Sequence, residues 1–537
     1  MEGTINQSKE KILNFFTNNF NLILIAILIF SFYLRLKYFN VNTAVWWDES
    51  EYLVTAKHWA LGVPYEIASQ RQPLFPLLIS IFYFLGFHSE AIIRFFVVLL
   101  PSFFSVYLTY LLGKELYDKY TGLIAAYIMG IFWVLLFNTA RVHTDPIAFV
   151  FGLAAFYFFW KGYVKKQKET LNLILTGLFL GLGFLIRVGG VLPIVIIISY
   201  LLITENIKIF KKKKLYLTAI VSTITVSPYL IWNYFHFGNL LAFWDLYFGA
   251  RKAAIKFSSP IAWHLMDYFQ QYTGTIFFIL FLIGLTYLIR VFLGFDLIFK
   301  NKDKSLKSDF FITLSILVPM IFFIFIERQA EPRWVIIMAP AIFYIIAKGC
   351  KTIYNLISKY DNLIAIAVIT ILLIAGSVYQ LKLNNDLINQ KKDSYFQFRD
   401  AGLWIKENSN TGDLIYSNGL PQVNYYSERY TWSMGGGSPE KFEEVLGGMY
   451  NKTRYMILSL LEIEPQWMSQ ETFLQNGLDW KLPYFEAELL VQNNQAQATF
   501  KGQPVDYFPP PEIIKNDLKF NLVYSIEGLF IYEITYL

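Results

Sequence analysis

The feature that most limits how this chain can fold is a series of long apolar runs between residues 19 and 380. A helix needs roughly 20 mostly apolar residues to cross the hydrocarbon core of a bilayer. Only 16% of the residues are charged, whereas a soluble domain usually has about 25%. We therefore predict a polytopic α-helical membrane protein with about eleven transmembrane helices. The expected spans are residues 19–37, 92–112, 122–138, 145–160, 172–187, 190–204, 215–233, 274–292, 310–327, 334–348 and 361–380.

The lysines between these runs indicate the topology. Every second loop is rich in lysine, and the short loops between them contain none. The lysine-rich loops hold Lys114 and Lys119, Lys161 to Lys168, Lys208 to Lys214, Lys300 to Lys307, and Lys348 to Lys359. The positive-inside rule places these loops and the N-terminus in the cytoplasm of a multi-pass cell-membrane protein. The net charge of +6 therefore reflects topology, and no nucleic acid partner is expected.

Two segments complete the organisation. Residues 73–87 are apolar, but counting them as a twelfth span would place the lysine-rich loops outside. Because Pro73 and Pro76 disturb a regular helix start, we expect this segment to lie in the membrane or re-enter it. The composition changes after residue 383, which predicts a membrane domain over residues 1–383 and an extracytoplasmic soluble α/β domain over 384–537. In that domain we expect helices at 395–407 and 439–446 and strands at 413–417, 454–459, 520–525 and 529–535.

Two adjacent carboxylates, Asp48 and Glu49, follow Trp46 and Trp47 in the first outer loop. The tryptophans fit an interfacial aromatic belt. One interpretation of the carboxylates is an exposed acidic loop. The other is a functional site, because a carboxylate near the membrane boundary can take a proton from an acceptor hydroxyl or bind a cation.

The outer face also carries single arginines, a residue that binds phosphate through a planar fork of donors. They are Arg71, Arg141, Arg187, Arg328 and Arg333. Such a set suits an anionic lipid headgroup, and the alternative is ordinary interfacial snorkelling. Asp145, close to Arg141, has a second interpretation as the N-cap of the next helix, with Pro146 in its first turn. All five histidines fall in outer regions without ligand-like spacing, so the metal ligands are unknown and a divalent cation remains possible.

The chain resembles the membrane glycosyltransferases of the GT-C class, in the branch of the protein O-mannosyltransferases and the lipid A aminoarabinose transferase. The resemblance rests on short motifs in a shared order along nearly the whole chain. They are Asp48-Glu49 with Tyr52, Arg71 to Leu78, Arg141 to Asp145, Arg187 to Gly190, Trp404 to Asn408 and Tyr425 to Arg429. One departure is Arg71-Gln72 before a single proline, where the aminoarabinose transferase has an acidic-basic pair before two prolines. That difference weakens the case for lipid A as acceptor and for that enzyme's metal site.

The resemblance implies an inverting transfer of a sugar from a polyprenyl- or dolichyl-phosphate donor at the outer face. Asp48 would be the acceptor-activating base, and Glu49 would orient the site or help to hold a cation. Asp145 would be a second acidic position that orients the acceptor or the sugar. Residues that would bind the donor phosphate or line its pocket are Tyr52, Arg71, Arg141, Arg187 and Arg333. The physical chemistry agrees, because a phosphate leaving group needs cationic stabilisation and the acceptor hydroxyl needs a base.

Other functions remain open at this point. A transporter or lipid flippase would need polar residues within the spans or broken helices in corresponding halves, and a non-catalytic scaffold would leave the Asp48-Glu49 pair unexplained. An oligosaccharide transferase would usually carry a larger outer domain, so we favour transfer of a single sugar. The expected partners are the lipid-linked donor, membrane lipids, and a glycan, lipid or protein acceptor.

Overall fold

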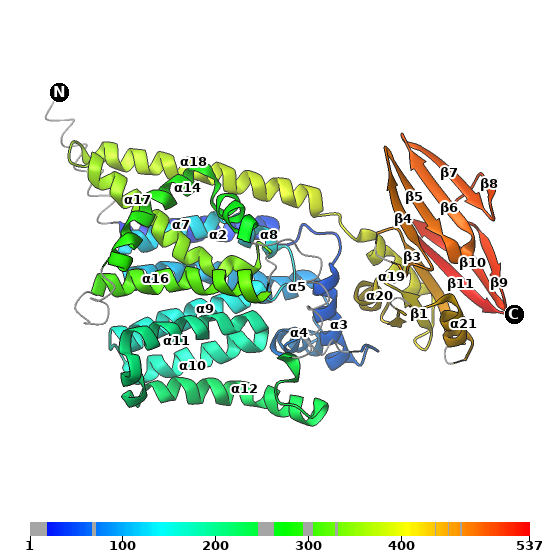
Figure 1. Cartoon of the computed structure of the whole chain (residues 1–537), viewed down its shortest axis with the longest axis horizontal. Helices are drawn as coiled ribbons and strands as arrows, with labels where there is room; N and C mark the ends of the chain where they lie inside the picture. The colour runs from blue at the N-terminus through cyan, green and yellow to red at the C-terminus, as the bar shows by residue number, and fades with distance from the viewer. Residues whose placement is uncertain are drawn as a thin grey trace. The chain divides into compact units, whose positions relative to one another are not determined.

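A computed structural model describes residues 19–66, 71–244, 262–293, 304–327, 331–434, 437–448, 451–461 and 464–537. The chain divides into two compact units. The first consists of residues 1–41, 68–78 and 87–391, and the second of residues 42–67, 79–86 and 392–537. Figure 1 shows that the first unit is built from helices, whereas both β-sheets belong to the second.

Within the described part of the chain, ten helices are long and apolar enough to cross a membrane, and a bent pair adds an eleventh. Each corresponds to a predicted span. In chain order they are α2 (Phe20–Tyr38), α5 to α6 (Glu90–Leu116), the bent pair α7 (Lys119–Ile131) and α8 (Trp133–Thr139), α9 with η2 (Asp145–Val164), α10 (Glu169–Ile186), η3 to η4 (Val188–Lys211), α12 (Leu215–Phe237), the apolar part of α14 (Phe269–Ile289), α16 with η5 (Ser305–Glu327), η6 with α17 (Ile336–Ile357) and α18 (Asn362–Lys391). The predicted polytopic helical fold is confirmed.

The apolar segment with two prolines forms the short helix α4 (Leu74–Phe84). Its eleven residues rise by about 17 Å, which is too short for a bilayer core of about 30 Å. The assignment of Lys348 to a loop was wrong. Lys348 lies inside α17 (Ala339–Ile357), where it is buried and pairs with the buried Asp309 of α16 (Lys304–Ile321). The pairing makes it possible for a lysine to lie within a span.

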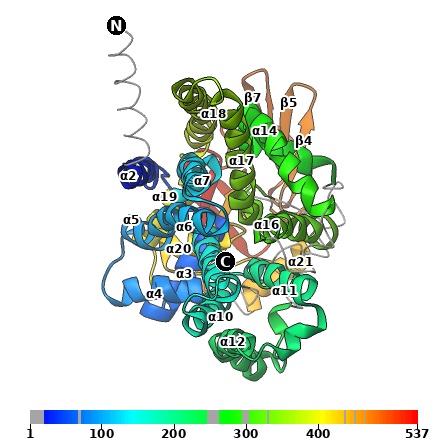
Figure 2. The same cartoon turned by 90° about the vertical axis from the view of Figure 1, so that its left-hand side faces the viewer.

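The helices of the first unit pack in neighbouring pairs that Figure 2 shows close to end-on. Helix α10 packs against α9 (Asp145–Phe159) and α12, and α17 packs against α7 and α14 (Ala262–Leu293). Little of α12 is buried, so most of its apolar surface is available to lipid. The start of α9 at Asp145, the turn after α10 at Arg187 and the start of α11 (Leu192–Glu205) all line one pocket.

Two buried polar side chains hold the break between α7 and α8, which are bent by 45°. Arg35, fully buried on α2, donates to the carbonyl of Gly130 at 3.0 Å and to the hydroxyl of Ser102 at 2.8 Å. Gln380 on α18 accepts from the backbone N–H of Trp133 at 3.1 Å. These bonds satisfy backbone groups that the helix break releases. They also secure α8, which leads directly into the loop before Asp145.

The second unit contains a mixed six-stranded sheet with the order β2-β1-β3-β11-β10-β9. In this sheet β1 is parallel to β2 and β3, and the remaining pairs are antiparallel. A second sheet is an antiparallel meander, β4-β5-β6-β7-β8. The strands are β1 (Leu414–Ser417), β2 (Tyr430–Trp432), β3 (Thr453–Ser459), β4 (Gln470–Leu474), β5 (Gly477–Leu482), β6 (Ala487–Gln492), β7 (Gln495–Phe500), β8 (Gln503–Val505), β9 (Glu512–Lys515), β10 (Leu518–Ile526) and β11 (Leu529–Tyr536).

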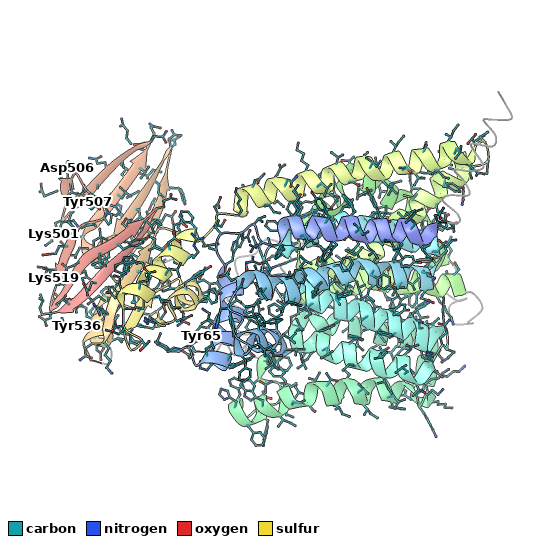
Figure 3. All side chains as sticks on the ribbon, turned by 180° about the vertical axis from the view of Figure 1, so that it is seen from behind. Tyr65, Lys501, Asp506, Tyr507, Lys519 and Tyr536 are labelled. Carbon is teal, nitrogen blue, oxygen red and sulfur yellow. The ribbon has the colours of Figure 1, made fainter. Side chains whose placement is uncertain are left out.

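The six-stranded sheet is covered on both faces. Phe398 and Ile405 of α19 (Phe396–Asn408) pack on one face, and Trp480 of the second sheet joins the core on the other. Two further helices, α20 (Leu420–Ser427) and α21 (Pro439–Gly448), complete this part. Figure 3 shows Lys519 and Tyr536, which belong to β10 and β11, and Lys501 at the turn between β7 and β8. The helices at 395–407 and 439–446 and the four strands were predicted, whereas the second sheet was not.

Candidate functional site

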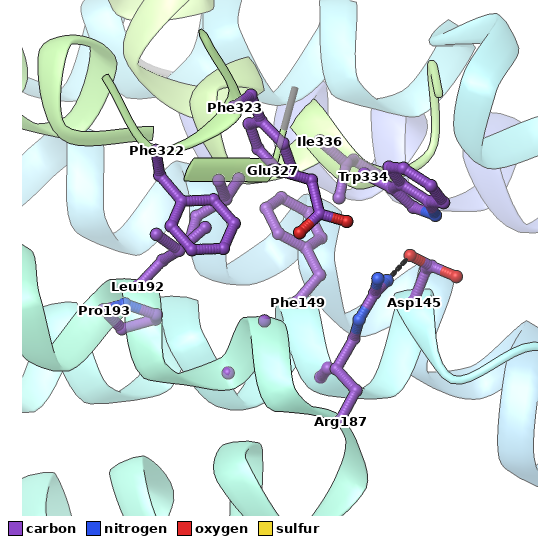
Figure 4. Close-up of a pocket in the computed structure, with 14 residues that line it drawn as sticks. Asp145, Phe149, Arg187, Leu192, Pro193, Phe322, Phe323, Glu327, Trp334 and Ile336 are labelled. Carbon is purple, nitrogen blue, oxygen red and sulfur yellow. Dashed lines mark hydrogen bonds and ion pairs between the residues drawn. The ribbon is translucent and has the colours of Figure 1, made fainter. Parts of the chain in front are cut away.

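A pocket opens in the first unit where α9, the turn after α10, and η5 and η6 approach one another. Three of its lining residues are charged, namely Asp145, Arg187 and Glu327. Figure 4 shows the Asp145–Arg187 ion pair and the Glu327 carboxylate directed into the same space as aromatic side chains. The pocket therefore combines charged hydrogen-bonding groups with an apolar wall.

Asp145 begins α9, as predicted, but it does not cap the helix. The N-cap position is Thr144, and no side-chain hydrogen bond caps the helix there. The Asp145 carboxylate is instead 4% exposed and forms an ion pair with the guanidinium of Arg187. The capping interpretation is therefore wrong, and Asp145 contributes a carboxylate to the pocket.

Arg187 is placed by a tight turn after α10. It is the extended residue between α10 and the short helix η3 (Val188–Val191). A Cβ atom on Gly190 would lie 2.2 Å from the carbonyl oxygen of Gly183, so only glycine lets η3 fold back onto the last turn of α10. Gln72 also supports this turn, because its side-chain oxygen accepts from the backbone N–H of Val188 at 3.1 Å. The Arg187-to-Gly190 motif thus sets the direction of one guanidinium.

Glu327 was not singled out in the sequence. It ends the π-helix η5 (Phe322–Glu327), is 2% exposed, and lines the pocket together with Phe323 and Trp334. π-Helical turns often occur at functional sites. The available signal was an acidic residue that directly follows an apolar run, next to Arg328. Arg328 itself lies outside the described residues.

The other predicted arginines that the structure describes in the first unit have separate surroundings. Arg333 precedes Trp334 and contacts the ring of His143 at 2.9 Å, and its Nε donates to Glu331 at 2.6 Å. Arg141 is 7% exposed, and its guanidinium stacks on the ring of Phe137 at 4.6 Å. Arg71 is half-buried and directly precedes Gln72. Of the predicted arginines, Arg187 alone is among the pocket's lining residues.

Asp48, Glu49 and Tyr52 lie on α3 (Trp47–Leu61), in the second unit. Asp48 and Glu49 occupy the first turn of this helix, where the helix dipole favours carboxylates. Glu49 is fully buried, Asp48 is half-buried, and Tyr52 is 6% exposed. Asp48 and Tyr52 are four residues apart, so they share a face of α3.

Two motifs that carry the resemblance, Trp404 to Asn408 and Tyr425 to Arg429, lie beside α3 within the second unit. The hydroxyl of Tyr426 accepts from the backbone N–H of Val45 at 2.8 Å. Glu428 pairs with Lys57 at 2.8 Å and with Lys406 at 2.7 Å. Burial alone raises the pKa of Glu428, but the hydrogen bonds from Lys406 and Lys57 outweigh it and hold that pKa below its ordinary value. These motifs hold α3 against α19 and α20.

Among the residues that the structure describes, no group of three or more His, Cys, Asp or Glu side chains is arranged to hold a metal ion. The histidines have separate environments. His58 hydrogen-bonds to the carbonyl of Val63 at 2.8 Å, His143 contacts Arg333, and His236 stacks on Trp232. We therefore derive no chemical step through a metal.

Comparison with known sequences gives one family and one curated relative. The family described as dolichyl-phosphate-mannose-protein mannosyltransferase matches residues 70–232. These residues include Arg71, Arg141, Asp145 and Arg187. An uncharacterized protein of Aquifex aeolicus (strain VF5) is 30% identical over 204 residues, which are 36% of this chain. The match spans 40% of the length of that relative.

Comparison with solved structures shows the fold. The archaeal oligosaccharyltransferase AglB from Archaeoglobus fulgidus, in complex with an inhibitory peptide and a dolichol-phosphate, matches with a TM-score of 0.61 and 13% identity, over 83% of this chain and 70% of that one. ArnT from Cupriavidus metallidurans in the apo state matches with a TM-score of 0.54 and 11% identity, over 83% of this chain and 93% of that one. The form of ArnT bound to undecaprenyl phosphate matches with a TM-score of 0.51 and 11% identity, over the same shares of the two chains. These proteins share the architecture predicted from the sequence, so the chain has the GT-C fold, and its resemblance to the membrane glycosyltransferases of this class is confirmed.

Proposed function

We propose that this protein transfers a single sugar from a polyprenyl- or dolichyl-phosphate donor to an acceptor hydroxyl, with inversion at the anomeric carbon. The observation that carries the proposal is the pocket in which the Asp145–Arg187 ion pair faces an aromatic wall. The comparisons support a lipid-linked donor, because the AglB structure contains a dolichol-phosphate and the second ArnT structure an undecaprenyl phosphate. The matched family is described by its use of dolichyl-phosphate mannose.

In the proposed reaction the acceptor oxygen attacks the anomeric carbon from the side opposite the phosphate. Asp48 takes the hydroxyl proton, the bond from the anomeric carbon to the phosphate oxygen breaks, and the lipid phosphate leaves with one more negative charge. Arg187 stabilises that charge, because its guanidinium is cationic and presents five N–H donors. Glu49 orients Asp48 or helps to hold a cation. Tyr52, Arg71, Arg141 and Arg333 are further proposed donor-binding residues.

We propose that the reaction takes place at the extracytoplasmic face. The pocket lies where α9 begins and α10 ends, whereas Lys165, Lys166 and Lys168 lie at the opposite ends of these helices. Because lysine-rich loops remain in the cytoplasm, the pocket then opens to the outside. The same rule assigns α3, which follows the first span, and residues 392–537, which follow the last span, to the outside.

The size of the C-terminal part of the second unit, residues 392–537, supports the transfer of a single sugar, because an oligosaccharide transferase usually carries a larger outer domain. Membranes containing the protein are to be supplied with polyprenyl phosphates that carry single neutral sugars, and with one that carries an oligosaccharide. We expect sugar transfer from at least one single-sugar donor to an acceptor mixture of Ser/Thr peptides, lipid-linked glycans and membrane lipids.

The matched variant in this experiment is Arg187→Ala. Loss of one charged donor to a leaving phosphate usually costs about 10²- to 10³-fold in kcat, so we expect a decrease of that size. Transfer of the oligosaccharide alone would identify an oligosaccharide transferase. No transfer from any donor, together with movement of the lipid between leaflets, would identify a transporter and overturn the proposal.

A further inference from the structure

The charged residues that line the pocket differ in their exposure to solvent. The side chain of Arg187 is 24% exposed, whereas that of Asp145 is 4% exposed, and Glu327 is 2% exposed as a residue. The cationic group thus lies nearest to solvent, and the carboxylates lie deeper. The position of Arg187 suits an anion such as a donor phosphate, and the deeper carboxylates do not.

The interior suits a ligand that brings hydrogen-bond donors. The side-chain carbonyl oxygen of a carboxyl group accepts hydrogen bonds, so Glu327 and Asp145 are complementary to hydroxyl groups. Phe149, Phe323 and Trp334 form an apolar wall beside them. A sugar ring has both properties, because its hydroxyls donate hydrogen bonds and its C–H faces pack on aromatic rings. A phosphate or carboxylate of the ligand would instead place its own hydrogen-bond acceptors against the side-chain oxygens of Glu327 and Asp145.

We propose that this interior is the subsite for the sugar ring of the donor and that Glu327 is a specificity-determining residue. Glu327 accepts hydrogen bonds from the ring hydroxyls, and Trp334 packs against the ring. The pocket accordingly takes neutral sugars and excludes uronic acids, whose carboxylate would face the carboxylate of Glu327. The inference rests on the proposed function for the identity of the lipid-linked donor.

The test measures binding, so that it does not depend on turnover. The purified full chain is titrated with undecaprenyl phosphate, with the same lipid carrying a neutral hexose, and with the lipid carrying the corresponding uronic acid. The wild-type protein should bind the hexose lipid more tightly than the bare lipid phosphate, and the uronic acid lipid less tightly than the hexose lipid. The variants are Glu327→Gln, which keeps the shape of the side chain, and Glu327→Asp, which keeps its charge.

Glu327→Gln should weaken binding of the hexose lipid by roughly 10- to 100-fold, the range for a lost hydrogen bond to a charged group. It should leave binding of bare undecaprenyl phosphate unchanged and should narrow the discrimination against the uronic acid. Glu327→Asp should keep that discrimination. Unchanged binding of the bare lipid also shows that the variant is folded.

The control is Glu205→Gln. Glu205 lies at the end of α11 remote from the pocket-lining Leu192, about 20 Å along the helix, where it pairs with Lys212 at 3.5 Å. This variant should bind all three lipids as the wild type does. Equal loss of hexose-lipid and bare-lipid binding in Glu327→Gln, or no loss of either, would overturn the sugar subsite. A wild-type protein that binds the hexose lipid but transfers no sugar would overturn the proposed function and leave the subsite result standing.

Discussion

At the scale of single residues, the sequence identified charged groups by type, and the fold decided which of them meet. Asp145 and Arg187 are 42 positions apart and form one ion pair. Glu327 joins them from a segment that lies another 140 residues along the chain. The sequence offered Asp145 and Arg187 as separate candidates, because an arginine after a span has the same appearance whether it snorkels or lines a pocket.

The first residue-scale prediction concerns Asp48. Asp48→Asn removes the proposed proton acceptor while it keeps the size of the side chain. General-base catalysis contributes about 10²- to 10⁴-fold, so we expect kcat to fall by at least about 10²-fold, with little change in the KM for the donor. Steady-state kinetics of sugar transfer measure both constants. Full activity of Asp48→Asn would exclude Asp48 as the base and shift attention to Glu49 and Asp145.

A second residue-scale prediction concerns Glu428, whose pKa lies below its ordinary value because of Lys406 and Lys57. A depressed pKa in the folded state stabilises the protein above the unfolded-state pKa, and this contribution disappears as the pH falls through the folded-state pKa. We expect Glu428→Gln to lower the unfolding temperature at pH 7. The difference from the wild type should shrink as the pH falls below 4.5, the ordinary value for glutamate, and should disappear below the folded-state pKa.

Thermal unfolding of the full chain across this pH range measures the effect of Glu428→Gln. Glu407→Gln is the control, because Glu407 is an exposed carboxylate beside Lys406 on α19. A difference between wild type and Glu428→Gln that grows as the pH falls would contradict the assigned sign.

At the scale of elements, the break between α7 and α8 is a feature that hydropathy does not predict. The run that forms α7 and α8 was predicted as one span, and the structure bends it by 45° next to Phe132. Hydropathy records only the apolar length, which a bend does not change. The bend depends on Arg35 and Gln380, which come from α2 and α18 and satisfy backbone groups beside the break. Such partners are recognised only after the helices are packed.

The element-scale prediction is that Arg35→Ala destabilises the protein. The substitution removes hydrogen bonds from a buried charged group to the Gly130 carbonyl and the Ser102 hydroxyl. Hydrogen bonds to charged groups contribute about 1.5–3 kcal/mol each, so we expect the free energy of unfolding to fall by at least about 2 kcal/mol. Unfolding in detergent micelles measures it.

Lys37→Ala is the matched control for Arg35→Ala, because Lys37 lies on the same helix and is exposed. This variant should change the free energy of unfolding by less than about 0.5 kcal/mol. Equal effects of the two substitutions would contradict the role of Arg35 in holding the break.

At the scale of the whole molecule, the placement of lysines predicts a cytoplasmic N-terminus and an extracytoplasmic C-terminal domain. The chain has a single cysteine, Cys350, which is buried, so Cys350→Ala gives a background for site-directed labelling. In intact cells a membrane-impermeant maleimide should label Thr411→Cys, in an exposed turn of the second unit. Lys213→Cys, in a lysine-rich loop, should react only after the membrane is permeabilised. The opposite pattern would reverse the topology.

The sequence by itself determined the number of spans, the presence of a separate α/β part and the chemical types of the candidate groups. These follow from apolar run length, from lysine placement and from local motifs, all of which act over fewer than about 25 residues. The five-stranded meander escaped prediction in part because β4 and β7 are short and largely exposed, which weakens the alternation of apolar and polar residues.

Only the tertiary structure decided the composition of the pocket. In the folded chain Asp145 pairs with Arg187 and does not cap a helix. Lys348 is buried in an ion pair with Asp309. Glu327 and Trp334 line the same pocket. The physical reason is that a buried charge is stable only when another group compensates it, and that group is usually distant in sequence. Local pattern records that a charge is present, whereas long-range packing selects its partner.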